Sequence, residues 1–573
     1  MIKNKIDKLL ELFKPNDIGG YIVPTSDEYL SEYTPAYAKR LEFITGFSGS
    51  NGFAIILAGK SLFFTDGRYT TQALIQLDKA LFSVHDIQNI AEFDWHNFIT
   101  GETVGYDPRL FTNSALHKFN KLKLKPITSN LIDQIWYNKP PKPHSEIYEY
   151  PVKYAGKTSE NKIQMSRDFI RKNNAKALFI SEAASVCWLL NIRASDIDHS
   201  PLLLANALVT QDQIFLFTDK NRLKDKTSLE YVTFISENKT DQTLIDVDGI
   251  ICFDESQCNS HFASIIKKKE HINAKNPCTI EKACKNEIEI KHMIDGHVED
   301  AVAVCEMLSF IANCRDLPKY DEYKLGLLLT KYRAEGKNYV YDSFPTICGY
   351  QENGAIIHYK ANEDSAKKID GNGLLLIDSG GQYWGATTDI TRTIAIGSPS
   401  KTHQELYTQV LKGHIALACV KFPQNKITGA HLDILARQHL WQNGLDYQHG
   451  TGHGVGSFLS VHEGPQNISA TGFSSMIKSG MVVSNEPGYY KPGSFGIRIE
   501  NLIYAQDSKH TGFIEFENLT LVPYSKALIE MRQLSDYEIT YLKNYYSQIS
   551  TKVLPKLSIS AQEWLKTEID IFL

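Results

Sequence analysis

Five potential metal ligands follow one another in the last third of the chain, and they constrain its fold more than any other feature. The segments LLLIDSGG, ATTDITRT, HGTGHGVG, VVSNEPGYY and GIRIEN supply Asp378, Asp389, His453, Glu486 and Glu500. Carboxylate oxygens favour Mg²⁺ and Mn²⁺, whereas an imidazole admits Mn²⁺, Co²⁺, Zn²⁺ or Fe²⁺. Four carboxylates and one imidazole therefore suit a pair of divalent cations, and they predict a two-metal hydrolase site.

The first two ligands lie 11 residues apart, on two apolar segments around a glycine turn. This spacing lets Asp378 and Asp389 face one another on neighbouring strands, where their repulsion favours a cation between them. The plainer alternative is a pair of turn-capping aspartates, because DSGG is also good turn chemistry. The glycines around His453 permit close backbone approach, although a flexible surface loop has the same composition.

The last two ligands lie in strand-like settings. Glu486 follows the apolar segment MVVS and precedes a Pro-Gly turn. Ile497 and Ile499 alternate with Arg498 and Glu500, which predicts that the two charged residues share one face of a strand. A strand-end glutamate in water and a surface ion pair are the alternatives. Each motif is modest alone, but the five together predict a metal site.

Composition excludes several classes of protein. The chain has 573 residues and a net charge of −5, so it lacks the basic excess typical of nucleic-acid binders. No apolar run approaches the roughly 18 residues of a membrane-spanning helix. The N-terminal stretch MIKNKIDKLLELF has the apolar spacing of a helix rather than a signal peptide. Nine cysteines without a CxxC pair predict buried, reduced thiols and a cytoplasmic location.

The remaining chain predicts several domains. Residues 1–138 indicate an α/β domain with a helix, a strand at GGYIVP, a hairpin of GFAIILAG and KSLFFTDGRY, and a further helix from Tyr69. Residues 139–278 repeat this plan, with ALVTQDQIFLFTD as the second hairpin. The proline-rich stretch 136–145 is the best linker candidate.

A third domain, residues 279–525, carries the ligands. It opens with a long amphipathic helix, and two further helices are expected at 403–420 and 428–443. The apolar face of the first helix is predicted from Ile288, Met293, Val298, Val302 and Leu308. Residues 526–573 predict a helical extension that packs against the rest or forms an oligomer surface.

These segments resemble the pita-bread metallopeptidases, the family that includes methionine aminopeptidase, prolidase and Xaa-Pro aminopeptidase. GFSGSNGFAIIL with FTDGRY, and then LNIRASDIDHSP, are similar to two successive creatinase-type domains. ICGYQENGAIIHY and HGTGHGVGSFLSVHEGP resemble the long, three-domain Xaa-Pro aminopeptidases. The resemblance spans most of the chain and implies two creatinase-type α/β domains followed by a pita-bread α+β catalytic domain.

The resemblance also implies a role for each matching ligand. Asp389 and Glu500 would bridge two metal ions. Asp378 would chelate one of them, and His453 with Glu486 would complete the other. Two divalent cations are thus implied, with Mn²⁺ expected and Co²⁺ or Zn²⁺ as alternatives.

Further residues would act on the substrate. Glu486 is the candidate general base, and His462 and His358 are candidates to stabilise the tetrahedral oxyanion. A core or loop histidine is the plainer alternative for each. The candidates expected to contact the peptide or its proline ring are His449, Arg498, Tyr490 and Arg68.

The implied activity removes the N-terminal residue from peptides with proline in second position, by a hydroxide held between the two metals. The implied protein is a cytoplasmic homodimer that acts on peptides and binds neither nucleic acid nor membrane. One alternative is a prolidase, which cleaves Xaa-Pro dipeptides. Another is a non-catalytic peptide-binding pseudopeptidase, although such proteins lose ligands and all five are present here.

Overall fold

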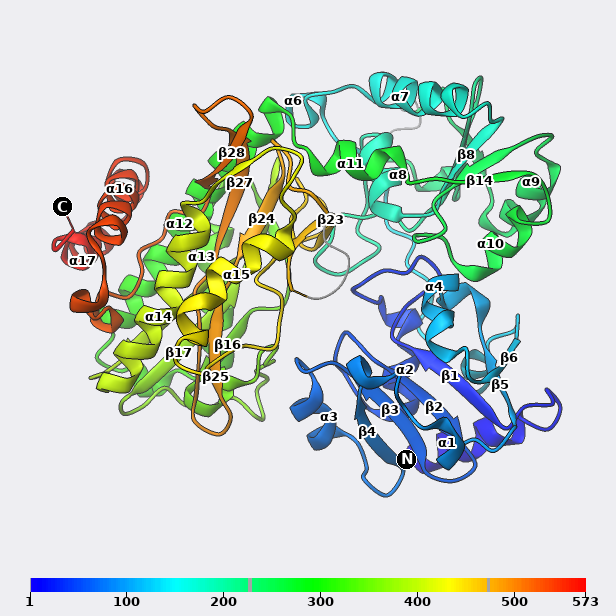
Figure 1. The fold of residues 1–573 in the computed structure, drawn as a ribbon, viewed down its shortest axis with the longest axis horizontal. Helices are drawn as coiled ribbons and strands as arrows, with labels where there is room; N and C mark the ends of the chain where they lie inside the picture. Colours follow the sequence, from blue (N-terminus) through cyan, green and yellow to red (C-terminus); the bar gives the residue numbers. More distant parts are fainter. Residues whose placement is uncertain (1, 225–228, 471–474, 573) are drawn as a thin grey trace. The chain divides into compact units, whose positions relative to one another are not determined.

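The computed structural model describes residues 2–224, 229–470 and 475–572. The chain forms two compact units, drawn in Figure 1. The first unit consists of Met1–Pro151 and Lys157–Thr279, and the second consists of Val152–Gly156 and Ile280–Leu573.

The first unit contains two six-stranded sheets. The first sheet has the order β4 (Phe82–Asp86), β3 (Ser61–Thr65), β2 (Phe53–Leu57), β1 (Gly20–Pro24), β5 (Thr103–Tyr106) and β6 (Lys123–Pro126). The second sheet has the order β12 (Thr233–Ile235), β11 (Ile214–Phe217), β10 (Ala207–Thr210), β8 (Ala177–Ile180), β13 (Ile251–Phe253) and β14 (His271–Asn273). A short pair, β7 (Tyr148–Glu149) and β9 (Ile192–Arg193), lies outside both sheets.

The two sheets have one plan, which confirms the repeat predicted from the sequence. β1 pairs antiparallel with β2 and parallel with β5, and β8 likewise pairs antiparallel with β10 and parallel with β13. Both predicted hairpins are present, as β2–β3 and β10–β11. Each hairpin is followed by a parallel partner, β4 in the first sheet and β12 in the second.

Alternating side chains along β2 explain why the first sheet is covered on both faces. Ala54 and Ile56 enter one apolar cluster with Ile6 and Leu9 of the first helix, whereas Ile55 enters another. Strands buried on both faces read as continuous apolar runs, as FAIIL does. The helices around the first sheet are α1 (Ile2–Glu11), α2 (Arg40–Thr45), α3 (Thr70–Gln76), α4 (Asn113–Leu116) and α5 (Leu131–Ile135). Those around the second are α7 (Ser159–Lys172), α8 (Ala183–Leu189), α9 (Thr240–Asp246) and α10 (Ser260–Ile266).

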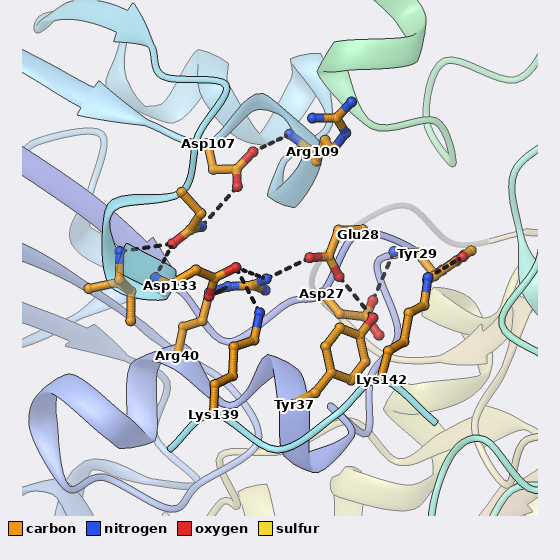
Figure 2. Close-up of polar contacts among 12 residues, drawn as sticks. Asp27, Glu28, Tyr29, Tyr37, Arg40, Asp107, Arg109, Asp133, Lys139 and Lys142 are labelled. Atoms are coloured by element: carbon orange, nitrogen blue, oxygen red, sulfur yellow. Dashed lines mark hydrogen bonds and ion pairs between the residues drawn. The ribbon is translucent and has the colours of Figure 1, made fainter. Parts of the chain in front are cut away.

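The first unit contains a network of ion pairs around the buried guanidinium of Arg40 (Figure 2). The guanidinium of Arg40 donates to Asp133 at 2.8 and 2.9 Å and to Glu28 at 2.6 Å. The predicted linker forms no helix or strand at residues 138–145, yet its lysines are paired. Lys139 bonds Asp133 at 2.7 Å, and Lys142 bonds Glu237 at 2.5 Å and the hydroxyl of Tyr29 at 2.9 Å. The proline-rich stretch is therefore held by charge rather than by secondary structure.

The second unit contains the strands that carry the predicted ligands. Two three-stranded sheets have the orders β15 (Tyr339–Asp342), β18 (Gly381–Tyr383), β19 (Ala386–Thr387), and β16 (Ile347–Tyr350), β17 (Gly373–Ser379), β20 (Ile390–Ile396). A six-stranded sheet has the order β21 (Lys421–Pro423), β28 (Phe513–Asn518), β27 (Asn501–Asp507), β24 (Val482–Asn485), β22 (Gly452–Gly454) and β23 (Glu463–Ile468). β25 (Gly488–Lys491) pairs with β26 (Phe495–Arg498).

Helices pack around these strands (Figure 1). They are α6 (Val152–Ala155), α12 (Glu287–Asn313), α13 (Glu322–Ala334), α14 (Lys401–Ala418), α15 (Gly429–Trp441), α16 (Asp536–Lys552) and α17 (Ile559–Ile569), while α11 (Pro277–Ala283) spans the border between the units. The two helices predicted at 403–420 and 428–443 are thus confirmed, as are two in the C-terminal tail. A capping box of Asn286 and Glu289 fixes the start of α12.

The predicted apolar face of α12 is partly wrong. Met293 and Leu308 are buried, and Val298 and Val302 pack against the core, but Ile288 is 42% exposed. Ile288 lies in the first turn of α12, which the capping box fixes by hydrogen bonds rather than by burial.

Two predictions from composition concern membrane spans and cysteines. No helix within the described residues is both long and apolar enough to span a membrane. No disulfide joins cysteines in the described part of the chain, and six of the nine thiols are buried.

We predict that Gly413→Ala destabilises the protein. Gly413 of α14 lies against α15, and a Cβ there would come within 2.1 Å of the Ala436 carbonyl oxygen. Overpacking costs about 1–3 kcal/mol, which outweighs the roughly 1 kcal/mol that alanine gains in a helix. Gly326→Ala in α13 is the matched control, because its Cβ would meet Thr346 at an ordinary 3.5 Å. Urea unfolding should move in opposite directions for the two variants; equal stabilisation would contradict the packing argument.

Candidate metal centre

The first two candidate ligands lie on one pair of strands. β17 and β20 pair antiparallel, with Asp378 opposite Thr391 and Ser379 opposite Ile390. Asp389 directly precedes Ile390, so its carboxylate lies beside that of Asp378. Both side chains are buried. Asp378 lies within β17 rather than in a turn, which disfavours the alternative of a turn-capping pair.

The other three candidate ligands come from the six-stranded sheet. His453 lies in β22, Glu486 directly follows β24, and Glu500 directly precedes β27. β24 pairs antiparallel with β27 and also with β22, so the three side chains leave neighbouring strands. This geometry explains how residues far apart in the sequence meet at one place.

The single strand predicted for Arg498 and Glu500 is wrong, although both side chains contact the Thr391 hydroxyl as residues of one face would. β26 ends at Arg498 and β27 begins at Asn501, so Glu500 lies in the short link between the two strands. Ile497 and Ile499 are buried, but Arg498 and Glu500 are also only 1% and 2% exposed. Alternating apolar and polar residues mark a buried and an exposed strand face only when solvent reaches one of the two faces. Solvent reaches neither face here.

The five candidate ligands lie close enough to hold cations. The potential ligand atoms of Asp378, Asp389 and Glu500 all lie within 4.8 Å of one another. Those of His453, Glu486 and Glu500 satisfy the same limit, so Glu500 belongs to both groups. Oxygen donors with a single imidazole fit a borderline divalent cation.

The electrostatics of the cluster also fit bound cations. Burial, together with repulsion from Asp378, raises the pKa of Asp389 well above its usual range. Burial and repulsion from Asp389 do the same to the pKa of Glu500. Burial raises the pKa of Glu486 to about 7, although His453 and Arg498 oppose the rise. Asp378 Oδ1 is buried without a hydrogen-bond partner among the described residues, as expected of an atom that bonds a metal.

Hydrogen bonds orient His453 toward the carboxylates. Its Nδ1 lies 2.9 Å from the Gly454 carbonyl oxygen, which can only accept, so Nδ1 carries the proton. Nε2 then presents its lone pair to the cluster, 3.4 Å from Asp389 Oδ2 and 3.6 Å from Glu486 Oε1. A backbone carbonyl that fixes the ring in this way is typical of metal-binding histidines.

A chain of hydrogen bonds leads from Asp378 to His449. Arg498 Nη2 donates to Asp378 Oδ2 at 2.6 Å, and Arg498 Nη1 donates to the Tyr490 hydroxyl at 2.7 Å. That hydroxyl lies 2.9 Å from His449 Nε2, and His449 Nδ1 lies 2.7 Å from the Gly450 carbonyl oxygen. The three predicted substrate-binding residues of this unit are thus joined, and Arg498 directly orients a candidate ligand.

The remaining candidates have distinct positions. The His462 ring lies 4.1 Å from that of His453, and a His462 nitrogen lies within 4.8 Å of ligand atoms of Asp389 and His453. The sequence analysis predicted that His462 lies near the substrate, and it did not predict that the ring lies close enough to bind a metal. His358 follows Ile357, whose carbonyl oxygen accepts from Arg498 at 3.3 Å. Arg68 lies in the first unit, where it bonds Asp66 at 2.7 Å.

Two hydroxyl groups of the site were missed by sequence reasoning. Thr391 Oγ1 donates to Glu500 Oε2 at 2.7 Å, and Ser484 Oγ lies 3.2 Å from Glu486 Oε1. Each residue lies two positions from a predicted ligand, Thr391 after Asp389 and Ser484 before Glu486. Side chains at i and i+2 share a strand face. The spacing of two could therefore have predicted that each hydroxyl lies beside the ligands.

We predict that a divalent cation stabilises the protein more at pH 8 than at pH 6. A carboxyl group whose pKa is raised by folding binds more protons in the folded state than in the unfolded state. The stability of the metal-free protein therefore falls as the pH rises from about 4.5, the unfolded pKa, to the folded pKa. For Glu486 that folded pKa is about 7. A cation replaces these protons and relieves the repulsion, and protons compete with it at low pH. Thermal melts with and without Mn²⁺ should show the larger shift at pH 8, whereas KCl of matched ionic strength should give none. A larger shift at pH 6 would contradict this account.

Models of known families match nearly the whole chain. A model of the Creatinase/Prolidase N-terminal domain matches residues 5–135, and a second model of that description matches 138–289. The model of Metallopeptidase family M24 matches 292–507, which contains all five candidate ligands. The model for the C-terminal region of peptidase M24 matches 512–571.

Full-length relatives share this organisation. The chain is 36% identical to Xaa-Pro aminopeptidase 1 of Dictyostelium discoideum, over 99% of this chain and 96% of that protein. It is also 36% identical to the probable Xaa-Pro aminopeptidase P of Laccaria bicolor, over 98% of this chain and 92% of that one. The crystal structure of a Caenorhabditis elegans X-prolyl aminopeptidase, described as a cytosolic enzyme with a di-nuclear active site, matches with a TM-score of 0.94 and 30% identity over 99% of both chains. The chain therefore belongs to metallopeptidase family M24, in the Xaa-Pro aminopeptidase group whose catalytic domain follows two creatinase-type N-terminal domains.

Proposed function

We propose that this protein is a metal-dependent aminopeptidase that removes the N-terminal residue from peptides with proline in second position. The observation that carries the proposal is the cluster of five ligand side chains, in a chain related over its full length to Xaa-Pro aminopeptidases. Three of the five side chains are buried, and carboxylates crowded in this way favour a chemical role over a stabilising one.

We propose two cations for this cluster. Asp378 would hold the first, His453 and Glu486 would hold the second, and Asp389 and Glu500 would bridge both. Glu500 belongs to both of the ligand groups described above, which supports its bridging role. Mn²⁺ fits four carboxylates and one imidazole best. When bound, such a pair of cations lowers the pKa of a shared water and polarises the scissile carbonyl.

The protein's own groups would move the proton and hold the peptide. Glu486 would take a proton from the attacking water and return it to the nitrogen of the departing proline. Ser484 Oγ bonds Glu486 Oε1, which leaves Oε2 for this transfer. His462 and His358 would stabilise the oxyanion, His449 and Tyr490 would form a wall of the proline pocket, and Arg68 would reach the substrate.

We also propose the wider setting of the enzyme. The domains would be 1–138, 139–278 and 279–525, with a C-terminal extension at 526–573; the two compact units support a border near 279. A cytoplasmic homodimer is proposed by analogy with related proteins, of which the Caenorhabditis elegans enzyme is described as cytosolic.

We predict that Arg-Pro-Pro is cleaved and that Arg-Pro is not. A tripeptide has its free amine and its proline in the expected order and continues beyond the proline, whereas a prolidase requires that proline to be C-terminal. Release of arginine from both peptides should be measured with Mn²⁺, Co²⁺ or Zn²⁺ present, with Arg-Ala-Pro as the control for proline in second position. Exclusive or equal cleavage of the dipeptide would favour the prolidase alternative.

We predict that Glu486→Gln lowers kcat by about 10²–10⁴, the usual contribution of a general base. Glutamine keeps an oxygen that can bind metal but cannot take the proton. Metal content and kcat should be measured on the same sample, with Glu517→Gln on β28 as the control. Turnover within tenfold of the parent in folded, metal-loaded Glu486→Gln would refute the base assignment.

A further inference from the structure

Two buried asparagines lie directly behind the candidate ligands Glu486 and Glu500. Asn485 of β24 is paired with Asn501 of β27, and both side chains are fully buried. Glu486 follows the first asparagine and Glu500 precedes the second. Both glutamates therefore leave the same end of one antiparallel strand pair. Anything that shifts this strand end shifts two of the ligands together.

A buried guanidinium holds this strand end. Arg392 Nη1 donates to the carbonyl oxygen of Glu500 at 2.6 Å and to that of Thr391 at 2.9 Å. Arg392 Nη2 donates to Asn501 Oδ1 at 2.8 Å. No carboxylate within the described residues lies within 4.0 Å of Arg392, whose charge is instead satisfied by carbonyl and amide oxygens. The position of Arg392 thus sets the backbone at Glu500.

Tyr545 of α16 fixes the guanidinium from the opposite side. Its hydroxyl accepts from Arg392 Nη2 at 3.1 Å and from Asn501 Nδ2 at 3.3 Å. It donates to the Val522 carbonyl oxygen at 2.9 Å. Tyr545 is 1% exposed, so water cannot replace these bonds. A residue of the C-terminal extension therefore contacts both groups that hold the Glu500 backbone.

Tyr524 and His414 complete the connection to the other ligand. The Tyr524 hydroxyl accepts from Asn501 Nδ2 at 3.1 Å and lies 3.1 Å from His414 Nε2. His414 Nδ1 lies 3.0 Å from the Asn485 carbonyl oxygen, which can only accept. The histidine therefore carries its proton on Nδ1, and its Nε2 accepts a hydrogen bond from the Tyr524 hydroxyl. Burial lowers the pKa of His414 to about 3, consistent with this neutral ring.

We propose that Tyr545 is a positioning residue for the metal centre: through Arg392 and Asn501 it fixes the strand end that presents Glu500 and Glu486. The inference rests on the proposed function, because it concerns affinity for the cations of that site. It gives the C-terminal extension a role in metal binding, where the sequence predicted only packing or an oligomer surface.

The test is Tyr545→Phe in the full-length chain, which removes one oxygen and keeps the ring. Groups that orient metal ligands typically contribute 10–100-fold to affinity, so we expect Mn²⁺ affinity to fall about tenfold in a chelator competition. The visible absorption of the Co²⁺-loaded protein should also change, because the ligand geometry changes. Tyr546→Phe is the matched control: the next residue of α16 is equally buried, and its hydroxyl bonds neither Arg392 nor Asn501 among the described residues. Its affinity and spectrum should stay within twofold of the parent.

The outcomes separate positioning from simple packing. A lower melting temperature for Tyr545→Phe with unchanged Mn²⁺ affinity and Co²⁺ spectrum would overturn the inference. Equal losses of affinity in both variants would also overturn it. If Tyr545→Phe does not fold, Tyr524→Phe carries the test with the same expected loss, and unchanged affinity there refutes the proposal. A parent protein that binds neither cation would refute the proposed function itself.

Discussion

The repulsion among four close carboxylates, three of them buried, is the constraint on which the second unit depends. Asp378, Asp389, Glu486 and Glu500 approach one another around His453, and burial raises the pKa of three of them. Without cations such a cluster must hold protons or destabilise the fold. Antiparallel pairing of β17 with β20, and of β24 with β27, holds the carboxylates together against this repulsion.

Much of the site could be predicted because each ligand carries a local signal. Asp378, His453 and Glu486 each lie beside glycines, prolines or apolar strands in a recognisable segment, and the repeated hairpins revealed the two N-terminal sheets. Predictions from apolar periodicity were wrong where both faces of a segment are buried, and where a helix cap rather than burial fixes the first turn. Glu500 lies between β26 and β27 rather than sharing a strand with Arg498, and Ile288 lies exposed in the capped first turn of α12.

The groups behind the ligands could not be predicted from the sequence. Arg392 and Tyr545 are 153 residues apart and share no spacing or motif, yet they bond in the folded chain. Their partners are mostly backbone carbonyls, which every residue has, so the sequence carries no sign of them. The tail packs into the core as predicted, and it is also connected by hydrogen bonds to the strand end at Glu500.

The number of metal ions bound per chain tests the central claim most directly. After reconstitution with Mn²⁺ and removal of free metal, elemental analysis should find two equivalents per chain, and release of arginine from Arg-Pro-Pro should rise in step with that content. Less than one equivalent, with no peptidase activity in folded protein, would contradict the account. Such a result would favour the non-catalytic binding module.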